Sequence, residues 1–259
     1  MRVSIVCLVL CISFVYGKPP SQIVGGKISS YNEFPHQVSI RVGKNHLCGG
    51  AILDKKHIIT AAHCFVETDG RLENPEGITI LAGVNNREDS SNGQEIKIES
   101  YSFHEEFTYT DGNKNDIAIV KLAQPLVFNS AVKPVNLPKA DTPLDTVATV
   151  SGWGAIYHMG GKPSALPNGL NKVDVAIVSS DSCTKSLKRQ IQPGQICAFI
   201  GVGRGTCVGD SGGPMIVGDE IIGIVSWGHP CAIGQPDVYT RVFHYLPWIN
   251  RNFKINKNL

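Results

Sequence analysis

Short apolar runs, bounded by glycine, asparagine or aspartate, recur along most of the chain. Several of them alternate apolar and polar residues with a period of two, such as Ile96 and Ile98, or Ile117 and Ile119. This period is typical of a β-strand with one buried face. The predicted strands are 37–42, 49–53, 57–60, 78–82, 95–101, 116–122, 147–153, 170–178, 195–199, 214–217, 220–227 and 237–241. Such a series of short strands predicts an all-β fold, either a barrel or a sandwich pair.

Two stretches depart from the strand pattern. Residues 123–146 carry four prolines and little periodicity, which predicts a connector between two β units. Near the C-terminus, one helical face would hold Val242, Tyr245, Trp248, Ile249 and Phe253. We therefore expect a short closing helix from about residue 246, with its aromatic side chains in the core and Pro247 as an unfavourable residue inside it.

The first segment has the pattern of a secretory signal peptide. Arg2 is followed by an apolar run over residues 3–16 and then by Gly17. The run is shorter than the roughly 20 residues that a membrane-spanning helix needs. A buried strand or an N-terminal anchor is the alternative interpretation. Because no other stretch approaches membrane length, we expect a secreted, soluble mature chain without membrane attachment.

Composition and charge narrow the function classes. The 259 residues suffice for a sizeable core, in one domain of two subdomains or in two small domains. A hydrophobic content of 42% with 18% charged residues argues against a disordered chain. The formal net charge is +2, and without residues 1–22, which contribute only Arg2 and Lys18, 22 basic residues face 22 acidic ones. This balance argues against a nucleic-acid partner.

The cysteines predict disulfides. Cys7 and Cys11 fall inside the predicted signal peptide. The other cysteines are Cys48, Cys64, Cys183, Cys197, Cys207 and Cys231. An even number in a secreted chain predicts three bridges, whose pairing the count leaves open. Metal binding is the rival use, but the chain has no CxxC pair and no Cys/His cluster with zinc spacing, so we expect no metal site.

The motif GDSGGP at 209–214 is the strongest chemical signal. A serine hydroxyl is a poor nucleophile until a base takes its proton, and the oxyanion that its attack creates needs N–H donors. Gly209 before Ser211, with Gly212 and Gly213 after it, fits a tight loop that presents both the hydroxyl and backbone amides. Alone, a glycine-rich turn with a serine is usually only a turn.

Three further motifs accompany it. TAAHC (60–64) contains a histidine, DIAIVKL (116–122) opens on an aspartate, and a chain cut before Ile23 begins with IVGG. In this order and at these spacings, the set resembles the chymotrypsin-like serine proteases of the trypsin/chymotrypsin family. The resemblance covers essentially all of 23–259. Within the family, the motif pattern is most similar to that of arthropod chymotrypsin-like and broad-specificity collagenolytic enzymes.

The resemblance implies an all-β fold of two packed six-stranded antiparallel β-barrels with a short C-terminal helix. The expected layout is a signal peptide over 1–17, a short propeptide over 18–22, and a serine protease domain over 23–259. Within that domain we expect barrel one at about 23–128, the connector at about 129–146, barrel two at about 147–245 and the closing helix at about 246–254. The implied disulfides are Cys48–Cys64, Cys183–Cys197 and Cys207–Cys231.

The resemblance also implies a catalytic triad. His63 would be the general base, Asp116 its orienting carboxylate and Ser211 the nucleophile. The backbone N–H groups of Gly209 and Ser211 would form the oxyanion hole, and Ser226 would lie near the buried aspartate. The predicted reaction is peptide hydrolysis through an acyl-enzyme, with activity that rises as His63 loses its proton.

Asp210 would serve activation rather than chemistry. In the family this carboxylate points away from the site and pairs with the α-amino group that cleavage creates, which here belongs to Ile23. Ser39 and His46 stand at positions that resemble those holding this aspartate in some zymogens. Because Gln22 precedes the cleavage point where trypsin needs Lys or Arg, another processing enzyme is expected.

Primary specificity follows from the residues at the expected pocket. Gly205 stands where trypsins have an aspartate, and Gly228 leaves the mouth open to large side chains. Asp237 stands where many members have glycine. If this carboxylate is hydrated or hydrogen-bonded, the pocket accepts large apolar and aromatic residues, and this chymotrypsin-like or broad preference is our first prediction. If it faces a bound cation, the pocket also accepts Lys and Arg. The third alternative is that Asp237 is a structural carboxylate bonded to nearby backbone.

No cofactor is expected. Val84 follows Gly83 where calcium-binding relatives have a glutamate ligand, so we predict no metal dependence. Expected partners are protein or peptide substrates and protein inhibitors of proteases, and a monomer is the default state. The rival functions are a non-catalytic homologue that acts as a binding protein, and an esterase or acyl transferase that uses the same chemistry.

Overall fold

The computed structural model describes residues 24–159, 162–229 and 231–255. The predicted signal peptide and propeptide, as well as Ile23, lie outside the described residues. No helix in the described part of the chain is both long and apolar enough to cross a membrane.

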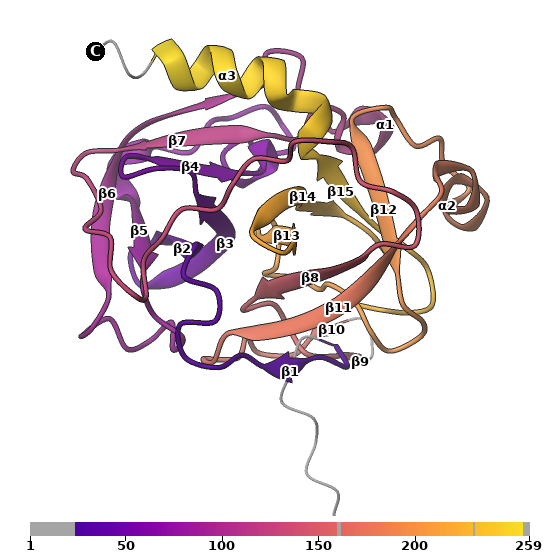
Figure 1. The fold of residues 1–259 in the computed structure, drawn as a ribbon, viewed down its shortest axis with the longest axis horizontal. Coiled ribbons are helices and arrows are strands. Elements are labelled where there is room, and N and C mark those ends of the chain that lie inside the picture. The colour runs from indigo at the N-terminus through magenta and orange to yellow at the C-terminus, as the bar shows by residue number, and fades with distance from the viewer. Residues whose placement is uncertain (1–23, 160–161, 230, 256–259) are drawn as a thin grey trace, which may run out of the picture.

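The first half of the chain forms a closed antiparallel barrel of six strands (Figure 1). Its strands are β2 (Gln37–Val42), β3 (Asn45–Ile52), β4 (His57–Thr60), β5 (Ile78–Ala82), β6 (Gln94–Phe103) and β7 (Ala118–Leu122), in the spatial order β2-β3-β4-β7-β6-β5. Closure leaves no free edge, so the interior positions of every strand are buried. Ile40, Ile58 and Ile80 are completely inaccessible to solvent.

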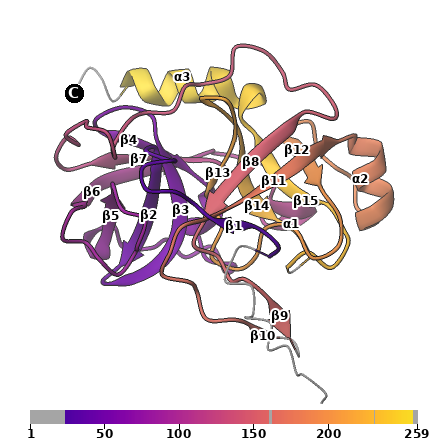
Figure 2. The same cartoon turned by 60° about the horizontal axis from the view of Figure 1, so that its bottom comes forward.

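The second half forms the other barrel. Its strands are β8 (Val147–Gly152), β11 (Asn171–Val178), β12 (Gln195–Phe199), β13 (Pro214–Val217), β14 (Glu220–Trp227) and β15 (Asp237–Arg241). Pairing of β8 with both β13 and β11 closes this sheet, and the short β1 (Lys27–Ile28) pairs with β11 beside it. The hairpin of β9 (His158–Met159) and β10 (Lys162–Pro163) projects from the body (Figure 2). The predicted fold class is therefore confirmed.

Helical segments are short. They comprise α1 (Thr110–Asn113), α2 (Ser180–Leu187), the closing α3 (Leu246–Ile255) and single 3₁₀ turns at Ala62–Cys64, Pro75–Gly77 and Val242–Tyr245. The sequence pattern did not predict α2, because Cys183 and Leu187 are its buried residues and the rest is polar. Pro247 does not disturb α3, since it is the second residue of the helix, where its missing N–H would have no intrahelical partner.

The predicted strands agree closely with the strands of the two barrels, whereas the two-residue strands β1, β9 and β10 were not predicted. Other differences occur at strand ends: β3 begins at Asn45, before the predicted 49, and β7 begins at Ala118. Asp116 therefore lies just before its strand, at the barrel end, rather than inside it. Residues 123–146, all of which are described, contain no helix or strand, in agreement with the predicted connector.

One hydrophobic cluster joins the barrels and the closing helix. It contains strand residues of barrel one, Ile216 and Ile224 of barrel two, and Trp248 and Ile249 of α3. Figure 1 shows α3 lying across barrel one near β7. The Oγ of Ser151 on β8 also donates a hydrogen bond of 2.6 Å to Oε1 of Gln37 on β2. The two barrels thus share a core and keep a fixed relative position.

All three disulfides pair as the resemblance implies. Cys48–Cys64 joins β3 to the 3₁₀ turn that carries His63, and Cys183–Cys197 joins α2 to β12. Cys207–Cys231 joins the segment before Ser211 to the loop that follows β14. Two of the three bridges thus tie down residues of the predicted site.

Candidate active site

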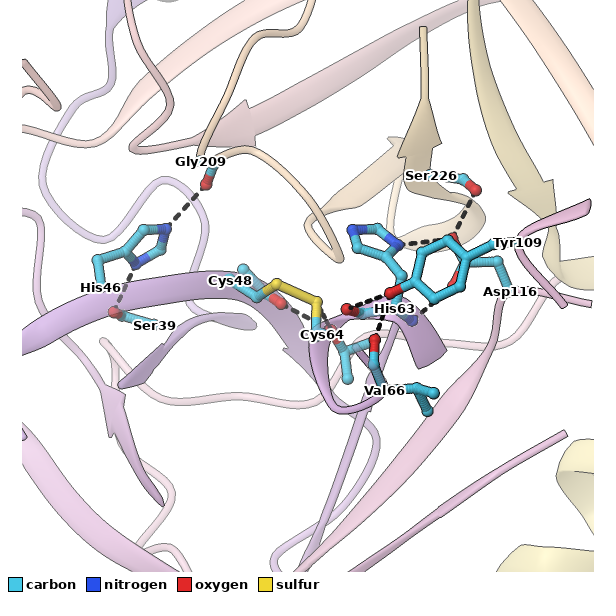
Figure 3. The surroundings of a disulfide bond; sticks show 12 residues. Ser39, His46, Cys48, His63, Cys64, Val66, Tyr109, Asp116, Gly209 and Ser226 are labelled. Atoms are coloured by element: carbon cyan, nitrogen blue, oxygen red, sulfur yellow. Dashed lines mark hydrogen bonds and ion pairs between the residues drawn. A yellow bond between two sulfur atoms is a disulfide. The ribbon is translucent and has the colours of Figure 1, made fainter. Parts of the chain in front are cut away.

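The pairing of two neighbouring strands brings His63 to Asp116. β4 and β7 are antiparallel with Thr60 opposite Ala118, so the segment that follows β4, which carries His63, lies beside the segment that precedes β7, which carries Asp116. Asp116 Oδ1 accepts the backbone N–H of His63 at 2.9 Å, and Oδ2 lies 2.7 Å from Nδ1 (Figure 3). Because a carboxylate only accepts hydrogen bonds, Nδ1 carries the proton and Nε2 of the neutral ring is left as an acceptor.

Barrel two supports this aspartate of barrel one. Ser226 Oγ on β14 donates to Asp116 Oδ2 at 2.6 Å (Figure 3). Thr240 Oγ1 on β15 donates to the backbone carbonyl of Asp116 at 2.6 Å. The Asp116 side chain is fully buried. A buried carboxylate is tolerated when its lone pairs are occupied, so Ser226 helps to hold the orientation of the Asp116 side chain, while Thr240 holds the backbone of the same residue.

Asp116 also sets the basicity of His63. Burial alone lowers the pKa of an imidazole, and the side chain of His63 is only 15% exposed. The charge of Asp116 and its hydrogen bond outweigh burial, so the pKa of His63 lies above its ordinary value. A ring with a raised pKa takes up a proton more readily than a free imidazole, which favours its use as a general base.

The Ser211 loop is fixed by backbone hydrogen bonds. The N–H of Gly49 donates to the Ser211 carbonyl at 2.8 Å, and the N–H of Gly212 donates to Val225 at 2.8 Å. Gly49 follows Cys48, and Cys48 is bridged to Cys64 in the turn that carries His63. The Ser211 loop is therefore tied to that turn.

The Ser211 hydroxyl makes no hydrogen bond to His63 within the described part of the chain, a contact that in enzymes without substrate is often long and tightens on binding. Among the same described residues, neither the N–H of Gly209 nor that of Ser211 donates a hydrogen bond. Two unpaired donors beside a partly exposed hydroxyl are the arrangement an oxyanion needs.

Asp210 points into the protein. Its Oδ1 accepts the N–H of Gly154 at 2.8 Å, and Oδ2 accepts that of Cys207 at 3.0 Å. Burial raises its pKa to about 7, although the two N–H donors act in the opposite direction. Gly154 is required here, since a Cβ at that position would lie 2.2 Å from Asp210 Oδ2. The carboxylate is therefore enclosed by backbone and needs a positive partner to stay charged.

Ser39 and His46 contact the neighbouring residue instead of Asp210. His46 Nε2 lies 2.8 Å from the Gly209 carbonyl, and Ser39 Oγ lies 2.7 Å from His46 Nδ1 (Figure 3). Burial lowers the pKa of His46 to about 4, so the neutral ring donates from Nε2 and accepts from Ser39. In this structure the pair holds the peptide that follows Gly209, and not the carboxylate that the resemblance suggested.

The segment after Ile23 lies beside the Asp210 loop. The carbonyl of Val24 accepts the N–H of Gly205 at 3.2 Å, and its side chain packs against Ala155, Cys207 and Cys231. Since Cys207 donates to Asp210, the described end of the chain lies next to the residues that enclose this carboxylate.

A cavity of about 280 Å³ opens beside Ser211. Its lining comprises Thr206, Cys207, Val208, Ser211, Val225, Ser226, Trp227, Gly228, His229, Cys231 and Asp237. Sequence reasoning had named Ser211, Ser226, Gly228 and Asp237 among these, and Cys207 and Cys231 as a disulfide. It did not name five others individually, although they adjoin Cys207 or the stretch 226–228 in the chain: Thr206, Val208, Val225, Trp227 and His229.

Asp237 takes the space that two glycines leave. A Cβ at Gly205 would lie 2.7 Å from its Oδ2, and a Cβ at Gly228 would lie 2.7 Å from its Oδ1. The N–H of Thr206 donates to Oδ2 at 2.8 Å. Burial raises the pKa of Asp237 to about 6, and Thr206 moderates that rise. Gly205 itself is thus next to the carboxylate but not part of the cavity wall.

Comparison with known proteins assigns the family. The family profile named Trypsin matches residues 23–249. The chain is 36% identical to chymotrypsin-2 of Vespa crabro, over 89% of this chain and 99% of that protein. It is 37% identical to trypsin-4 of Rattus norvegicus, over 91% of each chain. Hypodermin-B of Hypoderma lineatum is 36% identical, over 97% of this chain and 98% of its own length.

The solved structure of neuropsin, a serine protease expressed in the limbic system of mouse brain, superposes with a TM-score of 0.78. It is 28% identical over 88% of this chain and 98% of that chain. The chain belongs to the trypsin family of serine proteases and is an endopeptidase of that family. Its relatives include trypsins and chymotrypsins alike, so membership alone assigns no primary specificity.

The first prediction concerns the acidity of His63. Its pKa should lie above the ordinary value of about 6.5, and Asp116→Asn should lower it, because the neutral amide removes the charge that outweighs burial. NMR titration of the ring protons measures both values, with Asp54→Asn, beside the distant His57, as the control. An unchanged pKa in Asp116→Asn would contradict the interpretation of the contact.

Proposed function

We propose that this chain is a secreted serine endopeptidase in which His63, Asp116 and Ser211 form the catalytic triad. The observation that carries the proposal is the buried Asp116 carboxylate, which lies 2.7 Å from His63 Nδ1 and accepts a hydrogen bond from Ser226. This contact leaves Nε2 as the basic atom on the side of the ring that is free to receive a proton.

Acylation begins when Ser211 Oγ attacks the carbonyl carbon of the scissile peptide bond. Its proton passes to Nε2 of His63, and the charge that forms on the carbonyl oxygen is held by the N–H groups of Gly209 and Ser211. When the tetrahedral adduct collapses, the C–N bond breaks and His63 gives the proton to the leaving amine. Asp116 stabilises the imidazolium in between.

Deacylation repeats these steps with water in place of the serine. Water loses a proton to His63 as it attacks the acyl carbon, and collapse of the second adduct returns that proton to Ser211 and releases the carboxylic acid. Each group ends in its starting state, so no cofactor or metal is needed for the cycle. The predicted absence of a calcium requirement at Val84 stays a prediction.

We propose a broad primary specificity with large apolar and aromatic residues preferred. The cavity of about 280 Å³ is large enough for such side chains, and Val225 and the Cys207–Cys231 bridge give it apolar walls. The alternative, acceptance of Lys and Arg, is supported by the Asp237 carboxylate in the lining. One pocket can show both specificities if Asp237 changes its protonation state within the pH range in which the enzyme is active.

Activation would couple Asp210 to the new N-terminus. Removal of residues 18–22 frees the α-amino group of Ile23, and a buried carboxylate with a raised pKa is stabilised by such a cation. The place of Val24 beside Cys207 supports this pairing. Gln22 implies a processing enzyme of other than tryptic specificity.

The signal peptide over 1–17 and the three disulfides support secretion into an oxidising compartment. Protein substrates and protein inhibitors are the proposed partners, with a monomer as the active unit. The domain layout from the sequence stands as part of this proposal.

Labelling tests the function itself. The processed chain should react with a serine-directed phosphonate at Ser211, and Ser211→Ala should abolish labelling and lower kcat on an amide substrate by about 10⁶-fold. Intact-mass spectrometry counts the adduct and peptide mapping locates it, and Ser100→Ala, at an exposed position of β6, gives a serine control outside the site. A processed chain that remains unlabelled and cleaves no amide would establish the binding-protein alternative; turnover of esters alone would favour the esterase.

Primary specificity should change with pH. The kcat/KM ratio of an Arg substrate to a matched Phe substrate should rise through pH 6, because Asp237 is neutral below its pKa of about 6 and ionised above it. Titration of His63 affects both substrates and cancels in the ratio. Asp237→Asn should lower turnover of the Arg substrate by about 10- to 100-fold while the Phe substrate is retained. A ratio independent of pH and of this substitution would make Asp237 a structural carboxylate.

Activation should require a free Ile23. A precursor that keeps residues 18–22 should be at least about 100-fold less active than the same chain beginning at Ile23, since loss of one oxyanion donor costs about 10²–10³-fold. Replacing 18–22 with the recognition sequence of a specific protease that leaves Ile23 first gives the matched pair. Full activity of the uncleaved precursor would exclude the switch.

A further inference from the structure

Trp227 forms the side of the pocket that faces the end of α2. It is the last residue of β14, between Ser226 and Gly228, and all three line the cavity beside Ser211. The indole packs against the cluster of Cys183, Leu187 and Val238 and remains partly exposed. A chain that places one side chain in the cavity therefore comes close to this ring.

Arg189, in the segment that follows α2, covers the Trp227 indole. Its Cζ lies 5.3 Å from the centre of the Trp227 ring, within the range of a cation–π contact. Lys188 ends α2 in the left-handed conformation and so turns the chain away from the helix axis, which brings Arg189 over the ring. Arg189 is exposed, and its side chain forms no ion pair with any described residue.

The charges around this ring are predominantly positive. Lys185 and Lys188 accompany Arg189 at the end of α2, and Lys114 is exposed in the segment after α1, which packs against β14. None of these lysines forms an ion pair within the described part of the chain. The acidic group that α2 itself carries is Asp181, in the first turn at the opposite end of the helix. Among the side chains that the structure describes, the exposed guanidinium therefore has no carboxylate partner, and it lies on a ring that lines the cavity beside Ser211.

We propose that Arg189, stacked on Trp227, forms an acidic-residue subsite that selects an Asp or Glu side chain upstream of the scissile bond. An extended chain advances about 3.3 Å per residue, so a carboxylate roughly two to four residues before the bond reaches the guanidinium. The planar guanidinium can hold its stacking contact and bind a carboxylate through its edge N–H groups at the same time. The inference rests on the proposed peptidase function and deepens it by naming a second specificity element.

A purely structural role for Arg189 is the competing explanation. Basic residues near the C-terminal end of a helix stabilise it through the helix dipole, and Lys185 already stands in the last turn of α2. That role predicts changes in thermal stability but none in substrate preference. Lys185 also offers a matched control, because it carries the same charge in the last turn of α2, close to Arg189 in the chain, and has no cation–π contact with the indole.

The test compares peptide substrates that share one residue for the primary pocket and differ only in having Glu, Gln or Lys at each of the second to fourth positions before the bond. Wild-type enzyme should cleave its preferred Glu peptide about two- to fivefold faster, in kcat/KM, than the Gln peptide, the size expected for an exposed ion pair. Arg189→Gln should remove this preference, Arg189→Glu should reverse it toward Lys, and Arg189→Lys should restore part of it. High salt should weaken it.

Active-site titration with the phosphonate and turnover of the Gln peptide are measured for every variant. An Arg189→Glu enzyme with normal titration, normal Gln-peptide turnover and an unchanged Glu-to-Lys ratio would overturn the subsite. The same would follow if Lys185→Glu changed the ratio as much as Arg189→Glu, because the effect would then be a general field. A wild-type chain that neither titrates nor cleaves any peptide would instead refute the proposed function, and the subsite with it.

Discussion

The position of one buried carboxylate governs the site. Asp116 lies at the end of barrel one, yet its carboxylate is held by donors from both barrels: His63 on one side and Ser226 on the other. A charge in this position is tolerable only while those donors stay in place. The shared apolar core that fixes the barrels relative to each other is therefore also what gives His63 its tautomer and its raised pKa.

Two more carboxylates follow the same rule with different consequences. Asp210 and Asp237 are both buried, both accept backbone N–H groups, and both have raised pKa values, to about 7 and about 6. Neither has a cation among the described residues at hydrogen-bonding distance. Each is thus suited to receive a positive group from elsewhere: an amino terminus for Asp210 and a substrate side chain for Asp237. Glycines at 154, 205 and 228 leave the room these carboxylates occupy.

Much of the architecture could be predicted from periodicity, because alternation of apolar and polar residues reports directly on burial within a strand. Periodicity did not predict α2, because this helix has only two buried residues in an otherwise polar segment and so shows little apolar pattern. Proline at 247 was misjudged because its cost depends on the helix start, and the preceding 3₁₀ turn sets that start. The partner of His46 could not be predicted either, since Asp210 and the Gly209 carbonyl lie one residue apart and only packing decides between them.

The sequence by itself determined the family, the candidate serine, histidine and aspartate of the site, the disulfide candidates and the strand series, because these depend on residue identity and spacing. The tertiary structure decided how the groups act on each other. Hydrogen bonds to Asp116, enclosure of Asp210, the reach of Asp237 into the cavity and the stacking of Arg189 on Trp227 join residues far apart in the chain. Their energies depend on distance, burial and orientation, which arise only when the two barrels pack together.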